Sequence, residues 1–177
     1  DLEGVSVLHT SGLLTADALA PARERGAEVA SWHPLQSFPL PDLRPTPWDG
    51  VPCAVEGDPA AVEVGFDVAT TLGLRPWRIR PPDKPLYHAA AAVAANLAYL
   101  VVASARTLFA AAGLPSTDDP HPLAPMLATV IGTALADPGL TGLTGPLSRG
   151  DRETVARHLE VLPPPLGRHE SEDSGAS

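Results

Sequence analysis

The hydrophobic positions of this chain follow two patterns, and the change between them falls near residue 81. In the first part, short apolar runs typical of buried strands alternate with segments of helical character. Gly, Pro and Asp residues between the runs mark their ends. Strands are predicted at 5–8, 27–32, 51–55 and 74–80, and helices at 15–26 and 58–73. This order predicts an α/β layer.

The second pattern begins with a long apolar stretch at 81–113. Asp83 can cap a helix there, Pro85 suits its first turn, and Gly113 ends it. The body of the stretch is Ala, Leu and Val with almost no charge, so we expect one long helix buried nearly all round. At about 1.5 Å per residue, this helix would be roughly 45 Å long.

The change of pattern divides the chain into three segments. Residues 1–80 are expected to form the α/β part and residues 81–162 a helical domain. After the long helix, the domain is predicted to contain two more helices, at 121–136 and 151–162. Residues 163–177 have the composition of a disordered tail.

Composition then narrows the class of protein. The formal net charge of −9 argues against nucleic acid and against an anionic membrane surface as partners. The single cysteine, Cys53, excludes an internal disulfide framework, and its apolar neighbours predict a buried, inert thiol. The six histidines show no H-E-x-x-H or comparable spacing, so no metal site is expected.

Two features bear on the location of the protein. The first residues, DLEGVSV, are acidic and lack the apolar core of a signal peptide. Residues 86–112 are apolar over a length that raises the question of a membrane span. Their alanine content, and the ordinary soluble sequence on both sides, favour a soluble core helix and a cytoplasmic protein.

Two polar side chains near the start of the long helix, Lys84 and His88, are four residues apart and share a face. The positive end of a helix dipole lowers the pKa of a first-turn lysine towards the range of acid–base catalysis. The alternative is a solvated lysine and a histidine bonded to a backbone carbonyl. Asn96 lies roughly 18 Å along the axis and about 120° around it from Lys84, so one small reacting centre cannot easily touch both.

Several short stretches together resemble a known family. They are HTSG at 9–12, SWHPLQSFP at 31–39, EGDP at 56–59, PDKPLYHAAAAVAANLAYLV at 82–101, and LTGPLSRGD at 143–151 followed by His158. In combination they resemble the uncharacterised Rossmann-like oxidoreductases whose C-terminal half is a domain of unknown function. That family is related to ketopantoate reductase, pyrroline-5-carboxylate reductase and prephenate dehydrogenase. The resemblance covers about residues 4–162.

The resemblance implies an α/β plus all-α fold. The C-terminal half of a Rossmann-type domain would precede a helical (6-phosphogluconate-dehydrogenase-like) domain with one long central helix. It also implies NADP or NAD as cofactor, reduction of a carbonyl or imine on a small carboxylate, and a homodimer formed through the helical domain. The sequence contains no G-x-G-x-x-G, so the glycine-rich phosphate-binding turn is expected upstream of Asp1.

Two loops gain roles from the resemblance. Residues His9, Thr10, Ser11 and Gly12 match the loop that passes near the nicotinamide, at the carboxyl end of a strand. His33 and Pro34 look like the pair that borders the active cleft of prephenate dehydrogenases, where Gln36 and Ser37 could add hydrogen bonds to a substrate. The alternatives are a plain strand-to-helix turn at 9–12 and a proline-fixed turn with a structural histidine at 33–34.

The helical domain contributes the remaining candidates. Lys84 stands where ketopantoate reductase-like enzymes have a general acid, and His88 and Asn96 follow on the ridge where those enzymes carry asparagines. This difference implies a substrate other than ketopantoate. Arg149, within a family signature, is a candidate clamp for a substrate carboxylate.

Two functions stay open at this stage. One is an NAD(P)-dependent oxidoreductase without its N-terminal cofactor-binding segment. The other is a non-catalytic helical dimerisation or interaction module with a vestigial half-Rossmann sheet, because an incomplete sheet has an edge that needs cover. The sequence does not identify the substrate or choose between NAD and NADP.

Overall fold

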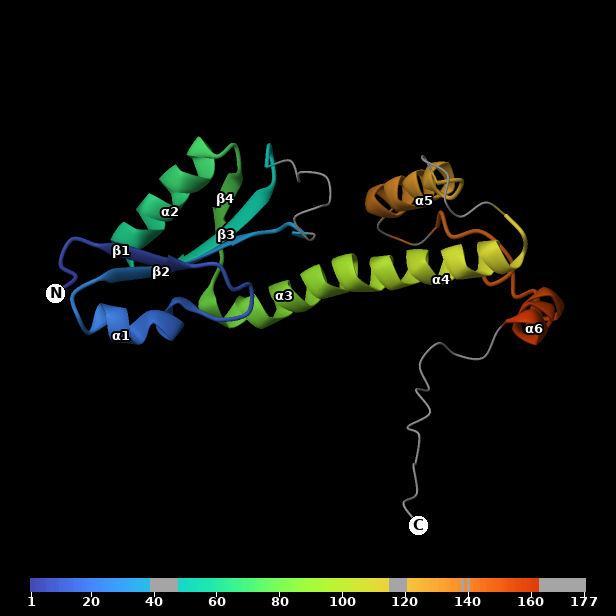
Figure 1. The fold of residues 1–177 in the computed structure, drawn as a ribbon, viewed down its shortest axis with the longest axis horizontal. Coiled ribbons are helices and arrows are strands. Elements are labelled where there is room, and N and C mark those ends of the chain that lie inside the picture. The colour runs from blue at the N-terminus through green and yellow to red at the C-terminus, as the bar shows by residue number, and fades with distance from the viewer. Residues whose placement is uncertain (39–47, 115–120, 138, 140, 163–177) are drawn as a thin grey trace, which may run out of the picture. The chain divides into compact units, whose positions relative to one another are not determined.

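The computed structural model describes residues 1–38, 48–114, 121–137, 139 and 141–162 (Figure 1). The chain divides into two compact units, Asp1–Val101 and Val102–Ser177. The first unit contains the sheet and the first part of the long helix. The second contains the end of that helix and the two helices that follow it.

A four-stranded mixed sheet forms the first unit, in the order β1-β2-β3-β4. Neighbours β1 and β2 are parallel, β2 and β3 antiparallel, and β3 and β4 parallel. All four predicted strands are confirmed, within one or two residues at each end. Their bounds are Ser6–His9 for β1, Glu28–Pro34 for β2, Pro52–Gly57 for β3 and Arg75–Arg78 for β4.

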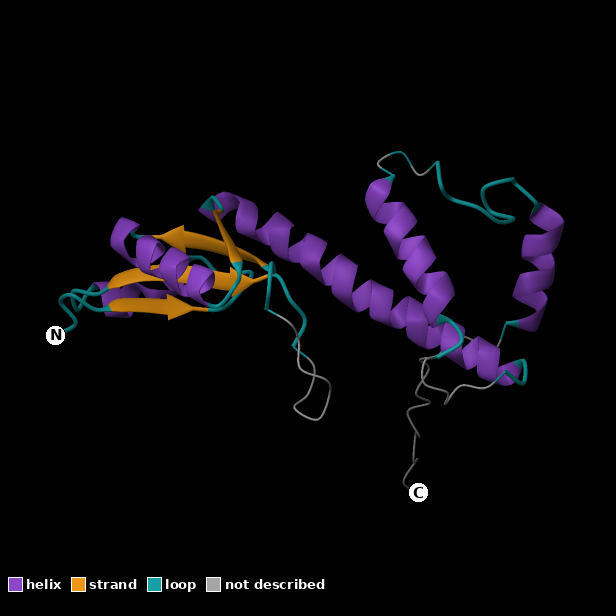
Figure 2. Ribbon diagram, turned by 90° about the horizontal axis from the view of Figure 1, so that it is seen from above, coloured by secondary structure: helices purple, strands orange, loops and turns teal. Residues whose placement is uncertain are grey.

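Helices cover both faces of this sheet (Figures 1 and 2). The 13-residue helix α2, Pro59–Thr71, packs on one face, where its Ala61 and Val62 join the larger apolar core. On the other face lie a 3-10 turn at Ala16–Leu19 and the short helix α1, Ala20–Arg23. The predicted helices at 15–26 and 58–73 are therefore confirmed, and so is the α/β class.

The alternation of side chains along β2 separates the core beneath α2 from a second face, which is apolar at Val29 and polar at Ser31 and His33. Ala30 and Trp32 belong to the core beneath α2, and the Trp32 indole N–H donates a 2.8 Å hydrogen bond to the Gly65 carbonyl. Successive residues of a strand point to opposite faces. Ser31 and His33 therefore point to the other face, where the long helix begins.

The predicted long helix is continuous over Pro81–Ala111. Gly113, with a φ of 82°, follows two residues after its last residue, as expected of a glycine that ends a helix. The helix starts with a 3-10 turn, and it contains a π turn between α3, Lys84–Ala92, and α4, Ala98–Ala111. The π turn, Val93–Leu97, departs from the single α-helix that we expected.

Two expectations about this helix need correction. Asp83 stands at the N-cap position of α3 as expected, but its side chain makes no capping hydrogen bond, because its carboxylate accepts a 2.6 Å hydrogen bond from the Arg80 guanidinium. The helix is also not buried nearly all round, since Leu86 is 77% exposed and Leu100 58% exposed. Its apolar surface extends beyond what the described part of the chain covers. By length and composition alone, Pro81–Ala111 could cross a membrane, a test that core helices of soluble proteins also pass.

The two helices predicted in the second unit are confirmed. Helix α5 is Ala124–Ala136 and helix α6 is Arg152–Val161. The Asp151 carboxylate caps α6 by accepting a 3.1 Å hydrogen bond from the Thr154 backbone N–H, which is the arrangement expected of an aspartate in that position. The predicted tail at 163–177 lies outside the described residues.

The geometry at Gly57, the last residue of β3, predicts how a substitution there changes the stability of the fold. Gly57 has a φ of 143°, and a Cβ on it would stand 2.6 Å from the Ala30 Cα and would also overlap the Val29 carbonyl. We expect Gly57→Ala to lower the free energy of unfolding by about 3 kcal/mol or more, because backbone must move in two strands.

Urea unfolding followed by tryptophan fluorescence measures this loss, since all three tryptophans lie in the first unit. The matched control is Gly4→Ala, which also has a positive φ (74°) but open space around the added Cβ. Backbone strain alone should cost that variant about 1 kcal/mol. Equal losses in the two variants would contradict the proposed overlap.

Candidate functional site

A row of polar side chains crosses the sheet on the face where the long helix begins. His9 of β1 pairs with Ser31 of β2, and Ser31 pairs with Glu56 of β3. Because residues paired directly across strands point to the same face, these three side chains lie side by side. Ser31 is fully buried and Glu56 is 6% exposed, so this row needs polar partners.

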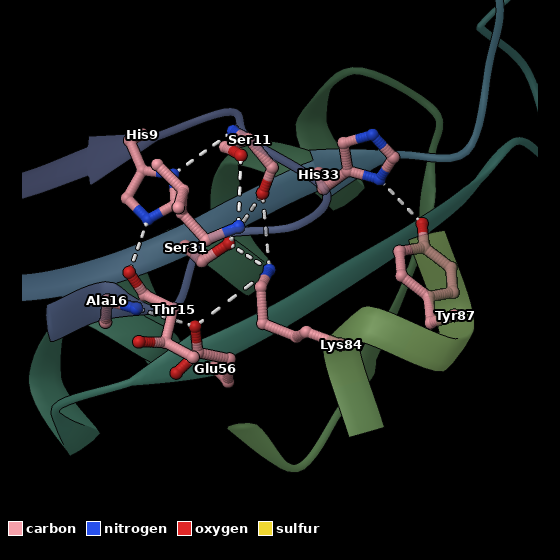
Figure 3. Close-up of polar contacts among 10 residues, drawn as sticks. His9, Ser11, Thr15, Ala16, Ser31, His33, Glu56, Lys84 and Tyr87 are labelled. Atoms are coloured by element: carbon pink, nitrogen blue, oxygen red, sulfur yellow. Dashed lines mark hydrogen bonds and ion pairs between the residues drawn. The ribbon is translucent and has the colours of Figure 1, made fainter. Parts of the chain in front are cut away.

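Lys84, the first residue of α3, supplies the central partner (Figure 3). Its ammonium group donates a 2.6 Å hydrogen bond to the Ser31 hydroxyl and a 3.3 Å bond to the Ser11 carbonyl. The Glu56 carboxylate lies 4.0 Å away, and Lys84 has no exposed surface. The alternative of a solvated first-turn lysine is therefore wrong.

Burial and charge act on this lysine in opposite directions. Loss of water lowers the pKa of Lys84, and the Glu56 carboxylate opposes that shift, with a lowered pKa as the result. The same carboxylate accepts a 2.8 Å hydrogen bond from the Ala16 backbone N–H. The lysine and the glutamate thus connect the 9–12 loop, two strands and the starts of two helices.

Both ring nitrogens of His9 are engaged within its own loop (Figure 3). Its Nδ1 accepts a 3.1 Å hydrogen bond from the Ser11 backbone N–H, which requires the proton to be on Nε2. That Nε2 lies 2.9 Å from the Thr15 carbonyl, to which it can donate. His9 therefore fixes the shape of the 9–12 loop, and neither nitrogen is left to bind a ligand.

Two other histidines meet at Gly12. The ring centroids of His33 and His88 are 6.5 Å apart. A Cβ on Gly12 would stand 2.7 Å from His88 Cδ2 and 2.8 Å from His33 Nε2. The glycine is thus required by the close approach of two imidazole rings. Because Gly12 has no side chain, the backbone of the 9–12 loop lies close to His33 and His88. Among the described histidines, only these two line the groove.

The surroundings of His33 disfavour its protonation. Burial is the largest cause of a lowered His33 pKa, and the Lys84 ammonium and the neighbouring His88 lower it further. The His33 Nδ1 lies 2.7 Å from the Tyr87 hydroxyl (Figure 3).

A groove of about 730 Å³ opens beside this pair of histidines and follows the helix. Its size falls within the range of small-molecule sites. Apolar and uncharged polar side chains form its described lining, which contains no Asp, Glu, Lys or Arg. The lining residues are His33, Leu35, Gln36, Ser37, Tyr87, His88, Ala90, Ala91, Ala92, Ala94, Ala95 and Asn96.

The structure thus brings some of the predicted residues together and separates others. Gln36 and Asn96 line the same groove as the two histidines, whereas Lys84 lies buried beneath the 9–12 loop. Thr10 is exposed, and Pro34 is buried in β2. Arg149 is an exposed residue of the second unit.

Sequence reasoning missed three residues of this region, namely Ser31, Glu56 and Tyr87. One signal was available for Ser31, because it alternates with His33 within an otherwise apolar strand and so had to share its face. The role of Glu56 depends on the pairing of β2 with β3, which follows a long loop, so the local pattern could not reveal it.

Comparison with known proteins identifies the family. Residues 51–172 match the sequence family described as a domain of unknown function, DUF2520, over more than half of the chain. The chain belongs to this family. No curated protein matches the sequence.

Two solved structures have a similar fold. One is a putative NADP oxidoreductase from Bacteroides fragilis, with a TM-score of 0.74 and 20% identity over 88% of this chain. The other is protein TM1727 from Thermotoga maritima, with a TM-score of 0.65 and 24% identity over 89% of this chain. This chain spans 57% and 60% of their lengths. At these identities the likeness establishes the fold, a Rossmann-like α/β layer with a helical part.

The lowered pKa of His33 predicts how stability depends on pH. The unfolded chain binds a proton at His33 near its ordinary pKa of about 6.5, whereas the folded chain binds it only at lower pH. The unfolded state therefore holds more protons in that window, and the free energy of unfolding should fall as the pH drops below about 6.5.

Urea unfolding at a series of pH values, read by tryptophan fluorescence, measures this slope. His33→Gln should flatten it. An unaltered slope in His33→Gln would show that the folded His33 titrates normally.

Proposed function

We propose that this family member is part of an NADP- or NAD-dependent oxidoreductase that reduces a carbonyl or imine on a small carboxylate. One observation carries the proposal: Gly12, His33 and His88 converge beside a groove of ligand size, where the parallel strands β1 and β2 end. Ligands of open α/β sheets gather at the carboxyl ends of such strands. The fold shared with a putative NADP oxidoreductase supports the same assignment.

The residues present fit the nicotinamide end of such a cofactor. The 9–12 loop follows β1, its shape is fixed by His9, and its Thr10 is exposed. We propose that this loop, His9 to Gly12, borders the nicotinamide. The glycine-rich turn that holds a pyrophosphate is not within these 177 residues.

We propose His88 as the proton donor to the reduced group. Its ring borders the groove, next to His33 and Gly12. An imidazole can donate a proton through one ring nitrogen to a group within hydrogen-bonding distance. The bound cofactor would supply the hydride.

Lys84, the other predicted catalytic residue, is proposed to act through its protein partners. Its ammonium has no exposed surface and holds the Ser31 hydroxyl and the Ser11 carbonyl in place. It therefore supplies a fixed positive charge beneath the site, which lowers the pKa of His33. It also fixes the loop that approaches the two histidines.

The remaining predicted residues are proposed to bind the substrate. His33, Gln36 and Asn96 provide uncharged hydrogen-bonding groups along the groove, and Pro34 stiffens the end of β2. Because the described lining of the groove contains no Lys or Arg, a carboxylate would need a cation from elsewhere. Arg149 is our candidate for that cation.

A second function is favoured by a specific observation, the exposed apolar surface of the long helix. Leu86, Tyr99, Leu100 and Val101 are each more than half exposed. Contiguous exposed apolar surface marks interaction sites. We therefore propose a homodimer formed through the helical part. From the net charge of −9 we propose in addition a cytoplasmic protein without nucleic-acid or membrane partners. If the chain is instead a helical interaction module, formation of this dimer is its only function.

The oxidoreductase proposal predicts nucleotide binding that depends on sequence outside this chain. Titration of NADPH and NADH, followed by nucleotide fluorescence, should detect binding by the full-length gene product and little by these 177 residues. His88→Gln in the full-length protein should keep nucleotide affinity. It should slow NADPH-dependent reduction of a panel of 2-oxo acids and imines by roughly 100-fold or more, the usual value of a general acid.

His158→Gln, at an exposed position of α6, is the matched control and should leave both properties unchanged. If the full-length protein binds neither nucleotide at millimolar concentration, the oxidoreductase proposal fails.

The dimer predicts a concentration-dependent mass. Sedimentation equilibrium of the chain should give twice the 18.3 kDa of one copy. Leu100→Glu should shift the mass towards one copy, because a buried, unpaired carboxylate is costly at an interface. Glu153→Gln, a change of charge at an exposed position of α6, should not. A stable dimer without nucleotide affinity in the full-length protein would favour the interaction module.

A further inference from the structure

Tyr87, which the sequence pattern did not single out, contacts the site through both its hydroxyl and its ring. It lies on α3 three residues after Lys84, and its hydroxyl oxygen is 2.7 Å from the His33 Nδ1. Its ring packs edge-to-face against Trp77, at a centroid distance of 5.7 Å, and against His33 at 5.5 Å. Two aromatic contacts and one hydrogen bond therefore fix the phenol relative to His33.

The geometry indicates which partner donates this hydrogen bond. Bonds donated by O–H are typically about 2.7–2.8 Å long, whereas bonds donated by N–H are about 2.9–3.0 Å. The phenol is protonated, because burial raises the pKa of Tyr87 to about 12. A neutral imidazole has one nitrogen that accepts and one that donates. A protonated phenol can donate to Nδ1 or accept from it, and the 2.7 Å separation favours donation by the Tyr87 O–H, which would leave the proton of His33 on Nε2.

We propose that Tyr87 is a positioning residue that fixes His33 in the Nε2–H tautomer, so that the ring presents an N–H donor beside Gly12. The His33 Nε2 is the atom that lies 2.8 Å from the position of a Cβ on Gly12. The His33 Nε2 therefore lies against the 9–12 loop and next to His88, and both rings also line the groove.

The ligand class follows from this tautomer. An N–H beside Gly12 binds a hydrogen-bond acceptor, such as a carbonyl oxygen or the alkoxide that forms from it. A neutral imidazole can stabilise such an oxygen without giving up its own proton. The two histidines then have separate tasks: His33 binds the oxygen, and His88 delivers the proton. This division of tasks rests on the proposed oxidoreductase function, whereas the tautomer does not.

Nitrogen-15 NMR of the histidine rings tests the tautomer in the chain as it is, without any ligand. At neutral pH the His33 Nδ1 should have the shift of an unprotonated, pyridine-like nitrogen, and Nε2 the shift of a protonated, pyrrole-like one. Comparison with His33→Gln assigns the two signals. A proton on Nδ1 in the wild-type chain would overturn the proposal by itself.

Tyr87→Phe removes the donor and keeps the ring. Both His33 nitrogens should move towards the intermediate shifts of a mixture of tautomers. Tyr99→Phe, the matched control on the same helix, changes the other tyrosine, which is 75% exposed, and should leave the spectrum unchanged. Tryptophan fluorescence checks that both variants are folded. A folded Tyr87→Phe with wild-type His33 shifts would also overturn the proposal.

The NMR test of the tautomer and the nucleotide-binding test of the proposed function can fail independently. A fixed Nε2–H tautomer in a protein that binds no nucleotide would leave the role of Tyr87 intact and remove the oxidoreductase. Nucleotide binding together with a proton on Nδ1 would support the oxidoreductase and overturn the role of Tyr87.

Discussion

The buried ammonium group of Lys84 is the interaction on which the arrangement of the first unit depends. A charge that is removed from water costs several kcal/mol unless hydrogen bonds and an opposite charge replace the lost hydration. Here the replacements are the Ser31 hydroxyl, the Ser11 carbonyl and the Glu56 carboxylate. They come from three different parts of the sheet, so the loop after β1, the strands β2 and β3 and the long helix must all be in place together.

This charge also explains why the two faces of the sheet differ. The face beneath α2 is a conventional apolar core that contains Trp32 and Val55. The opposite face carries the row of His9, Ser31 and Glu56, which only a polar partner can cover. The candidate site lies beside the middle of this row, where His33 follows Ser31 as the next residue of β2 to point the same way. Its side chains therefore stand on strands held by a buried network, which suits a site that must keep a fixed geometry.

The π turn in the long helix connects helix geometry to the groove. In a regular α-helix, residue 96 would lie about 80° around the axis from residue 88. A π turn places more residues in each turn, so each advances less around the axis, and Asn96 is brought back towards the face of His88. Both residues line the same groove as a result. Such turns are rare and frequently occur at functional sites.

The sequence by itself determined the strands, the helices and several of their ends. Apolar runs, Gly113 and the Asp151 cap act within a few residues of the chain, so local rules predict them. Tertiary structure decided what covers each surface. Lys84 donates hydrogen bonds to Ser31 and Ser11, which are 53 and 73 residues away in the chain. The Asp83 carboxylate binds the Arg80 guanidinium and not the backbone N–H groups at the helix end. The apolar pattern of the long helix predicts that its surface is covered. It does not indicate which molecule covers it. A periodic pattern records a preference of one element, whereas burial is a property of two surfaces in contact.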